Sequence, residues 1–319
     1  MRAAVRSKYG TGKVVTIKNV ETPVPSDDEL LIRVHAATVN RSDNHVLTGK
    51  PYAMRLFTGL FKPKDATTGS DFAGVVEAVG NKVQSFKIGD RVMGFTGGLR
   101  GGSHAEYFRF PAHKGVISMP ANTTFTEAAA CLEGAYYASV SIIDLKPRSG
   151  QKALVYGATG AIGSSYVQFL KNCGVYITAV CRSQHFGLVQ ALGAHKLIDF
   201  TKEDFTKDHE RYDFVFDAVG KSTFVKCKHM LKPKGFYIPT GGFENLLLVP
   251  LTRLFGGKQV YFPAPIRVTR GLNYVRDLIE KGRFKPVIDR IYPLEKISEA
   301  YAYVASGEKI GNVVITMDN

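Results

Sequence analysis

Seven residues between an apolar stretch and a helix-like stretch have the composition of a phosphate-binding turn. They are Gly157, Ala158, Thr159, Gly160, Ala161, Ile162 and Gly163. Glycine permits a tight turn and lets the backbone approach a pyrophosphate or a neighbouring helix closely. A helix that begins here would direct free N–H groups and a partial positive charge at phosphates. The pattern predicts a dinucleotide site, and ordinary turn glycines are the alternative.

The residues after the next expected strand bear on the choice of dinucleotide. Cys181, Arg182 and Ser183 stand where NAD-dependent enzymes place an acid that bonds the adenosine ribose. Without an acid there, Arg182 can bond a 2′-phosphate and Ser183 adds a donor. We therefore predict NADPH, with Arg182 as a solvated surface residue the alternative. Gly241, after a later strand, completes the predicted cofactor-binding set.

The expected secondary structure around this turn changes along the chain, from short strands to alternating strands and helices. The first third predicts short strands, among them residues 30–35, 75–79 and 91–95, and hence a small barrel-like domain. Strands and helices then alternate, which is typical of a parallel sheet. This second pattern comprises strands at 153–156, 175–180, 196–199 and 214–218 and helices at 164–172 and 186–192.

The last quarter is less regular. A strand follows Gly235, and a looser region is expected around Pro250, Pro263 and Pro265. Helices are expected at 271–281 and 297–306, and a strand at 311–316 is expected to return to the first domain.

Composition and charge exclude several classes of protein. With 45% hydrophobic residues in 319 and no apolar run of the roughly 18 residues that a membrane helix needs, we expect two globular domains, no membrane span and a cytoplasmic location. The four cysteines form no CxxC pair, which argues against a disulfide framework. The net charge of +14 is spread along the chain, so we predict no nucleic-acid partner and a small-molecule substrate instead.

Several motifs together resemble one family, the medium-chain dehydrogenase/reductases, and within it the quinone oxidoreductase branch that lacks zinc. The resemblance spans essentially the whole chain. Beside the turn at 157–163, it rests on the segments 69–80, 88–92, 101–107, 212–220 and 232–235.

The resemblance implies an α/β architecture in which a Rossmann-type doubly wound parallel sheet accompanies a GroES-like β-barrel catalytic domain. The catalytic domain is expected at residues 1–121, completed by 266–319, and the NADPH-binding domain at 122–265, with the active site in the cleft between them. A homodimer or homotetramer is expected as well.

The zinc enzymes of this family take metal ligands from a Cys, a His followed by Glu, and a later Cys. Here Asn40 replaces the first Cys, and Ser70 and Asp71 replace the His and Glu. Cys131 lies close to the third position, with Glu133 nearby, but one thiol cannot complete a tetrahedral site. We therefore predict no metal.

Without a metal, a donor is needed for the oxygen that becomes negative when a conjugated carbonyl accepts hydride. Asn40 is predicted to bond the nicotinamide or that oxygen. Ser42 and His45 match positions that relay a proton in the zinc enzymes, so we predict a relay. The alternative is that His45 is a polar helix residue and solvent supplies the proton. The apolar insertion at 52–61 is expected at the mouth of the site, as a selector of bulky substrates or as a subunit contact.

These expectations converge on an NADPH-dependent oxidoreductase that transfers hydride to quinones or other conjugated carbonyls without zinc. One alternative is an enone or 2-alkenal double-bond reductase, or an alcohol/aldehyde dehydrogenase. A different class of alternative is a non-catalytic NADPH-binding sensor protein.

Overall fold

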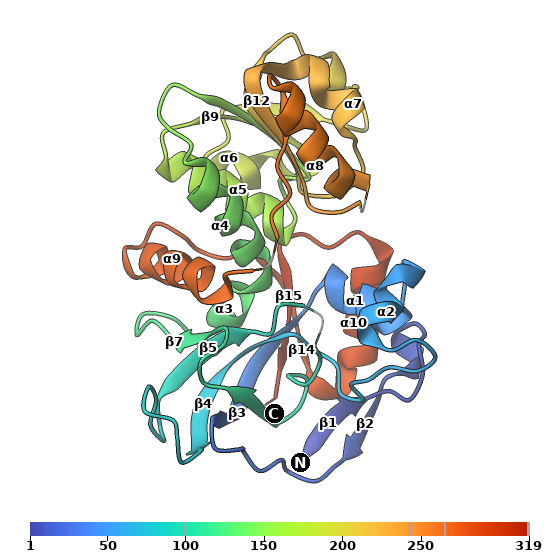
Figure 1. Ribbon diagram of the computed structural model, residues 1–319, viewed down its shortest axis with the longest axis vertical. Coiled ribbons are helices and arrows are strands. Elements are labelled where there is room, and N and C mark those ends of the chain that lie inside the picture. Colours follow the sequence, from blue (N-terminus) through green and yellow to red (C-terminus); the bar gives the residue numbers. More distant parts are fainter. Residues whose placement is uncertain (99, 243, 265, 318–319) are drawn as a thin grey trace. The chain divides into compact units, whose positions relative to one another are not determined.

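The computed structural model describes residues 1–98, 100–242, 244–264 and 266–317. The chain divides into two compact units (Figure 1). Unit 1 comprises Met1–Glu133 with Arg267–Asn319, and unit 2 comprises Gly134–Ile266. Unit 1 extends beyond residue 121 because helix α3 (Phe125–Ala130) packs against four of its strands. Within the described ranges, no helix combines the length and the apolar character needed to cross a membrane.

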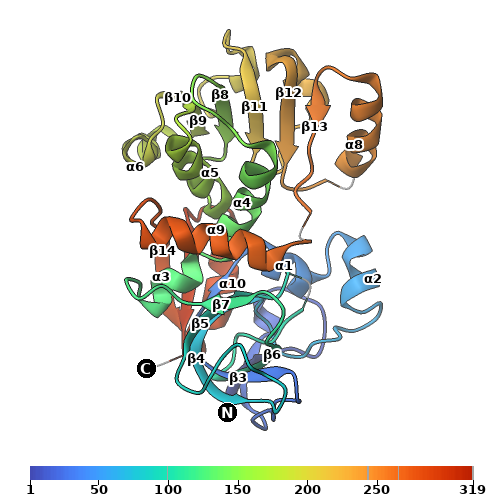
Figure 2. The ribbon, with the colours of Figure 1, turned by 60° about the vertical axis from the view of Figure 1, so that its left-hand side comes forward.

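Unit 2 is built on a six-stranded parallel sheet with the order β10-β9-β8-β11-β12-β13 (Figure 2). The strands are β8 (Lys152–Tyr156), β9 (Tyr176–Cys181), β10 (Lys196–Asp199), β11 (Tyr212–Asp217), β12 (Leu231–Pro239) and β13 (Gln259–Val260). From β8 the chain adds β9 and β10 on one side, and it then returns to add β11, β12 and β13 on the other side. The reversal of strand order between β8 and β11 is a switch point, where doubly wound sheets bind ligands. The predicted alternation of strand and helix is confirmed.

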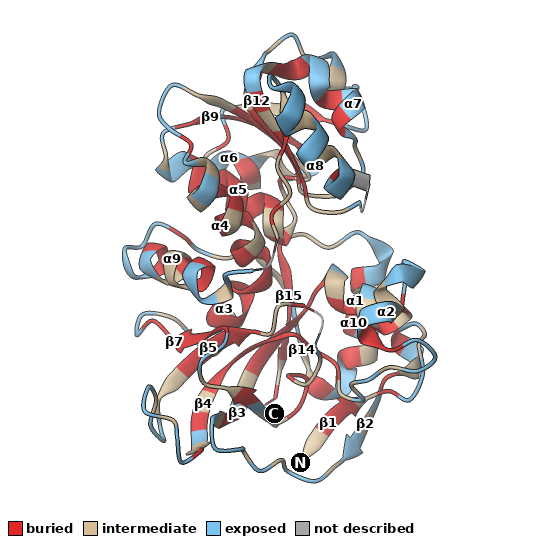
Figure 3. Cartoon of the chain, viewed as in Figure 1, coloured by how far each residue is buried: buried red, intermediate tan, exposed pale blue. Residues whose placement is uncertain are grey.

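The helices of unit 2 connect these strands. They are α4 (Glu133–Leu145), which starts at the last residue of unit 1, α5 (Ala161–Asn172), α6 (Phe186–Leu192), α7 (Phe224–Cys227) and α8 (Glu244–Phe255), with short 3₁₀ turns at Ser183–His185, Phe205–Lys207 and Lys228–Met230. The central strands are buried on both faces, which explains their continuous apolar sequences (Figure 3).

The expectation of a loose region around Pro250 is wrong, because Pro250 lies inside helix α8. Proline removes one helical hydrogen bond. Leu248 and Val249 nevertheless pack against the core of unit 2, and this burial holds the helix together. Pro263 lies outside any helix or strand, as expected, and Pro265 is outside the described residues.

Unit 1 contains a seven-stranded, mainly antiparallel sheet and a separate two-stranded sheet, β1 (Arg2–Val5) with β2 (Thr16–Asn19). The larger sheet contains β3 (Glu29–Val39), β4 (Asp71–Val79), β5 (Arg91–Phe95), β6 (Tyr107–Pro111), β7 (Val116–Ser118), β14 (Ile288–Pro293) and β15 (Asn312–Thr316). The predicted return of the last strand is confirmed, since β15 pairs antiparallel with β3.

Unit 1 also contains helices. They are α1 (Arg41–Thr48), α2 (Arg55–Thr58), α3, α9 (Val268–Glu280) and α10 (Ile297–Ser306), with 3₁₀ turns at Gly12–Val14, Tyr52–Met54 and Leu294–Lys296. Helix α1 begins directly after β3, and Asp43 accepts the backbone N–H of Asn40 at 2.8 Å across its first turn. Gly49 ends the helix in the left-handed conformation that glycine adopts without strain. The end of β3 therefore places Asn40 in the core of unit 1, whereas Ser42 on the following helix is half-buried and His45 is exposed.

Candidate active site

The glycine turn of unit 2 joins β8 to α5, and two of its glycines are required by the packing. Gly157 has φ +79°, and a Cβ there would lie 2.0 Å from Cγ2 of Val219. A Cβ on Gly163 would lie 2.1 Å from the carbonyl oxygen of Gly157. No real Cβ tolerates either contact, so Gly163 lets the first turn of α5 press against the end of β8 and Gly157 leaves room for Val219, which follows β11.

Gly160 and Gly241 differ from them, because the protein itself leaves space beside both. A Cβ on Gly160 would meet only the Gly157 carbonyl, at 3.5 Å, and a Cβ on Gly241 would meet no atom within 4 Å. Gly160 is also the N-cap of α5, where the first N–H groups of the helix lack intrahelical acceptors. The four predicted positions Ala158, Thr159, Ala161 and Ile162 lie in the same turn. These residues fit a nicotinamide dinucleotide, whose pyrophosphate they would hold.

Arg182 and Ser183 follow β9, as predicted, and Arg182 is exposed. The fold adds an acid that the local sequence did not reveal, because Asp199 at the end of β10 pairs with Cys181 in the sheet register. The Ser183 backbone N–H donates to Asp199 at 3.0 Å, and Thr201 donates to the other oxygen through its hydroxyl at 2.6 Å. These hydrogen bonds hold the pKa of Asp199 below its usual range, and the one from the Thr201 hydroxyl has the largest effect.

Two of the predicted catalytic residues, Asn40 and Ser42, contact a buried polar cluster of unit 1. Asn40 donates from its side-chain amide to the Thr38 hydroxyl and, at 3.4 Å, to Asp71. Asp71 is fully buried, and both of its oxygens accept hydrogen bonds from Thr38, through the backbone N–H at 2.7 Å and the hydroxyl at 2.5 Å. Burial raises the pKa of Asp71 well above its ordinary value.

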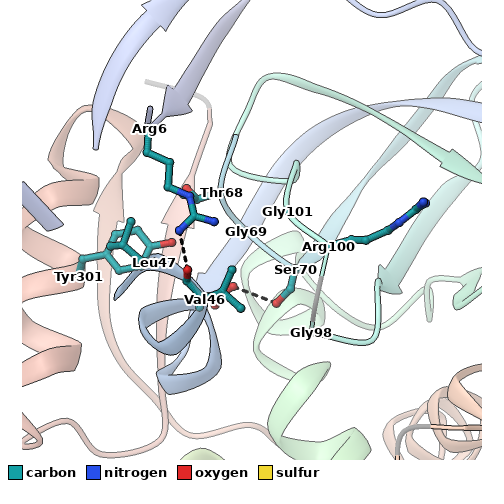
Figure 4. A pocket seen from close by; sticks show the side chains of 11 residues that line it. Arg6, Val46, Leu47, Thr68, Gly69, Ser70, Gly98, Arg100, Gly101 and Tyr301 are labelled. Carbon is teal, nitrogen blue, oxygen red and sulfur yellow. Dashed lines mark hydrogen bonds between the residues drawn. The ribbon is translucent and has the colours of Figure 1, made fainter. Parts of the chain in front are cut away.

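Asp43 is the second buried carboxyl of this cluster. One oxygen accepts from the Asn40 backbone, and the other accepts the Ser70 hydroxyl at 3.0 Å. Asp43 and Ser70 line a small pocket together with Arg6, Arg100 and Tyr301, among other residues (Figure 4). Burial raises the pKa of Asp43 to about 6, against the hydrogen bonds from Asn40 and Ser70.

Glu133 is the third buried carboxyl, and no role was predicted for it from sequence. The Ser42 hydroxyl hydrogen-bonds to its Oε1. Its Oε2 is buried and has no hydrogen-bond partner among the residues that the structure describes. Burial raises the pKa of Glu133 to about 8, and the nearby Asp43 carboxyl raises it further, whereas the Ser42 hydroxyl, the Lys309 ammonium and the side-chain amide of Asn40 lower it.

His45 lies one turn beyond Ser42 on α1, but its ring interacts elsewhere. Its Nδ1 lies 3.0 Å from the carbonyl oxygen of Lys50. In the described part of the chain no hydrogen bond joins Ser42 to His45, so the predicted relay has no direct link in this structure. Desolvation of the ring lowers the pKa of His45, which favours its neutral form.

The positions that correspond to zinc ligands do not fit a metal. The side chains of Asn40 and Ser70 are engaged with Thr38, Asp71 and Asp43. Across the described ranges, no group of three or more His, Cys, Asp or Glu side chains is arranged to hold a metal ion. Neither an amide nor a hydroxyl replaces a thiolate or an imidazole as a good zinc ligand, so no chemical step is assigned to a metal here.

The apolar insertion forms the 3₁₀ turn at Tyr52–Met54 and helix α2. It leaves several large side chains in solvent, namely Tyr52, Leu56, Phe57, Leu60 and Phe61. The guanidinium of Arg55 stacks on the ring of Tyr52 at 5.0 Å and on that of Tyr9 at 4.5 Å, which anchors the insertion to unit 1. Its role in substrate selection or subunit contact stays a prediction.

Two family models match the chain. Residues 26–121 match the alcohol dehydrogenase GroES-like domain, and residues 192–315 match a model described as zinc-binding dehydrogenase. The second description mentions zinc, but the residues at the ligand positions of this chain do not supply such a site.

Known proteins are similar over nearly the whole length. The quinone-oxidoreductase QR1 of Triphysaria versicolor is 30% identical over 99% of this chain and 98% of its own. The NADPH-dependent alkenal/one oxidoreductase of Arabidopsis thaliana is also 30% identical, over 99% of this chain and 79% of its own. The solved quinone oxidoreductase of Coxiella burnetii has the same fold, with a TM-score of 0.90 at 23% identity, and covers 100% of this chain and 99% of its own. The chain therefore belongs to the quinone oxidoreductase-like branch of the medium-chain dehydrogenase/reductase family, whose members are oxidoreductases.

Proposed function

We propose that the protein catalyses NADPH-dependent reduction of quinones without a catalytic zinc. The observation that carries the proposal is the turn between β8 and α5, where Gly160 leaves room for a phosphate at a helix N-terminus. The quinone oxidoreductases among the relatives support the choice of acceptor. When bound, NADPH supplies the hydride, and the protein contributes binding, orientation and a proton.

The end of β9 supports NADPH over NADH. Arg182 is exposed and free to turn toward a 2′-phosphate, with which a guanidinium makes a charge-assisted hydrogen bond. The negative charge of Asp199 would repel that phosphate if the carboxylate faced the phosphate. The carboxylate oxygens instead accept donors from Ser183 and Thr201, which compensates part of the charge.

Asn40 and Ser42 are the groups of unit 1 that we assign to the acceptor. Each carries a hydrogen-bond donor beside the buried carboxyl cluster, and hydride addition to a quinone leaves an oxygen that requires such donors. We keep His45 in the proposal only as a group that acts on Ser42 through an intervening molecule, because no direct hydrogen bond links them in the described structure.

Reduction of α,β-unsaturated aldehydes or ketones is the second candidate. It is favoured by the similarity to the alkenal/one oxidoreductase of Arabidopsis thaliana. Both reactions add hydride to a conjugated system and leave negative charge on an oxygen, so the same donors serve both. Simple alcohol oxidation is disfavoured, because Asn40 and Ser70 cannot supply the Lewis acid that it uses in the zinc enzymes of the family.

A panel of acceptors tests the proposal. NADPH absorbance is followed with quinones, enals, enones, simple aldehydes and alcohols, each with and without a chelator. We expect quinone turnover, weaker enal or enone turnover, and no effect of the chelator. Loss of activity on chelation would contradict the zinc-free reaction, and NADPH binding without turnover of any acceptor would favour the sensor.

A further inference from the structure

The three buried carboxyls of unit 1 differ in how their oxygens are satisfied. Both oxygens of Asp71 accept from Thr38, and both oxygens of Asp43 accept from Asn40 and Ser70. Paired donors of this kind stabilise the ionised form of a carboxyl and so oppose the effect of burial on the pKa values of Asp71 and Asp43. Glu133 is different, because one oxygen contacts Ser42 and the other is buried without a partner among the described residues.

A bare buried oxygen argues that Glu133 holds a proton. An ionised carboxylate needs donors on both oxygens when water is excluded, whereas the carbonyl oxygen of a neutral acid tolerates a missing donor at a smaller cost. Glu133 is buried, with only 6% of its surface exposed to solvent. Its raised pKa of about 8 agrees with this geometry.

The groups that face Glu133 set the balance between its two charge states. Asp43 from α1 and Asp71 from β4 carry the same charge when ionised, so they oppose a third negative charge in the cluster. Lys309, which precedes β15, has the opposite effect on the Glu133 pKa, and its ammonium donates to the Gly311 carbonyl at 2.6 Å. Burial lowers the pKa of Lys309 to about 8, so its charge is available at neutral pH. Glu133 can therefore be neutral at rest and ionised after it gives up a proton.

Ser42 connects this carboxyl to the position predicted for the acceptor. Ser42 donates to Oε1 of Glu133 when that carboxyl is ionised. With the proton on Oε1, the same contact becomes a donation from Glu133 to Ser42 Oγ, which leaves the Ser42 hydroxyl proton available to a second neighbour. The ring of His45, the partner expected from the sequence, instead contacts the carbonyl of Lys50. Among the described residues Glu133 is thus the titratable group in direct hydrogen-bond contact with Ser42.

We propose that Glu133 is the proton store for this enzyme and delivers its proton to the reduced acceptor through Ser42. After hydride addition the acceptor oxygen is negative. The Ser42 O–H bond breaks as its proton passes to that oxygen, and Ser42 Oγ takes the proton of Glu133. Glu133 is left as a carboxylate beside the Lys309 ammonium, and a proton from solvent restores it. Glu133 acts through Ser42 and is therefore a positioning and proton-storing residue. The inference rests on the proposed function.

The test compares Glu133→Gln with the wild type, with Ser42→Ala, with the double variant, and with Glu77→Gln as a matched control. Glu77 is an exposed residue of β4, outside the cluster. The amide of Gln keeps a partner for Ser42 but cannot titrate. Single-turnover reduction of a quinone is measured with saturating NADPH from about pH 6 to about pH 10, in H₂O and in D₂O.

The wild-type rate is expected to fall as the pH rises through about 8, because Glu133 loses its proton there. Glu133→Gln is expected to be slower by about 10²-fold, the lower range for loss of a general acid, with that alkaline decrease and the solvent isotope effect both removed. Ser42→Ala is expected to show the same decrease in rate as Glu133→Gln. The double variant is expected to be no slower than either single variant. Glu77→Gln is expected to behave as the wild type.

Infrared difference spectra between about pH 6 and about pH 10 add a readout that is independent of turnover. The wild type is expected to lose a carboxylic acid C=O band as the pH rises, and Glu133→Gln is expected to lack the component that titrates near 8. If the wild type reduces quinones while Glu133→Gln keeps its rate and pH profile, the inference is wrong and the proposed function stands. If the wild type reduces no conjugated carbonyl, both are wrong.

Discussion

At the scale of single residues, the departures from the zinc enzymes are compensated by hydrogen bonds within unit 1. Asn40 and Ser70 do not leave a vacant ligand sphere, because their side chains bond to Thr38, Asp71 and Asp43. The cluster remains polar and acidic, but its carboxyls are held by donors rather than by a cation. Only Glu133 has an oxygen without a described partner, which is why its chemistry differs from that of Asp43 and Asp71.

Arg182→Ala tests the choice of cofactor at the same scale. A hydrogen bond to a charged group contributes about 1.5–3 kcal/mol, so the Kd for NADPH is expected to rise about tenfold to a hundredfold. The Kd for NADH, which has no 2′-phosphate, is expected to change little. Both are measured by titration of nicotinamide fluorescence. Arg211→Ala, an exposed arginine of unit 2, is the control. An equal loss for both cofactors would contradict the role assigned to Arg182.

At the scale of elements, the approach of α5 to β8 depends on one position. Gly163 lies in the first turn of the helix, and the Gly157 carbonyl oxygen occupies the place where its Cβ would be. The same first turn presents the N–H groups that we assign to the pyrophosphate. Packing of the helix and binding of the cofactor are therefore coupled through this contact.

Gly163→Ala is expected to lower the free energy of unfolding by about 1–3 kcal/mol, because the added methyl forces α5 away from β8. NADPH affinity is expected to fall with it. Gly187→Ala is the matched control, since Gly187 lies in α6 and its Cβ would meet no atom within 4 Å. That change is expected to stabilise by about 0.5–1 kcal/mol. Both are measured by denaturant titration, and a Gly163→Ala variant with wild-type stability and affinity would refute the coupling.

At the scale of the whole molecule, buried ionisable groups make stability depend on pH. The raised pKa of Glu133 means that its stabilising contribution is complete below about 4.5 and is lost as the pH rises through about 8. His104 acts in the opposite direction, because burial lowers its pKa to about 4. Its contribution is complete above 6.5 and is lost as the pH falls toward 4. The two effects oppose each other between these limits, so the loss due to Glu133 becomes visible above pH 6.5.

Between pH 6.5 and 8 the free energy of unfolding is accordingly expected to fall, with Glu133 contributing about 2 kcal/mol of the decrease. Glu133→Gln is expected to remove this part of the slope, because an amide does not titrate. Urea unfolding is followed by circular dichroism, since the chain has no tryptophan. Parallel pH curves for the wild type and the variant would show that Glu133 is already ionised at neutral pH.

The sequence alone determined the architecture of unit 2 and the location of its turn. Strand β10 and helix α6 have the predicted bounds, and Gly157 and Gly163 are required by the packing as expected. Hydrophobic periodicity and glycine spacing are local signals, and a strand, a turn and a helix that follow one another are recorded in consecutive residues. The same signals failed at Pro250, where burial of neighbouring residues sustains a helix that proline disfavours.

The tertiary structure alone decided which charged groups meet. Glu133 is 91 residues from Ser42 in the chain, and it reaches that hydroxyl only because α1 and the start of α4 are brought together. Asp199 likewise reaches Ser183 because β10 pairs with β9 in a register that ends both strands together. No local pattern records such a pairing, since it depends on how strands and helices pack rather than on their own sequences. The residue types at 40, 42 and 70 could be read from the sequence, whereas the proton source that we infer for Ser42 required the fold.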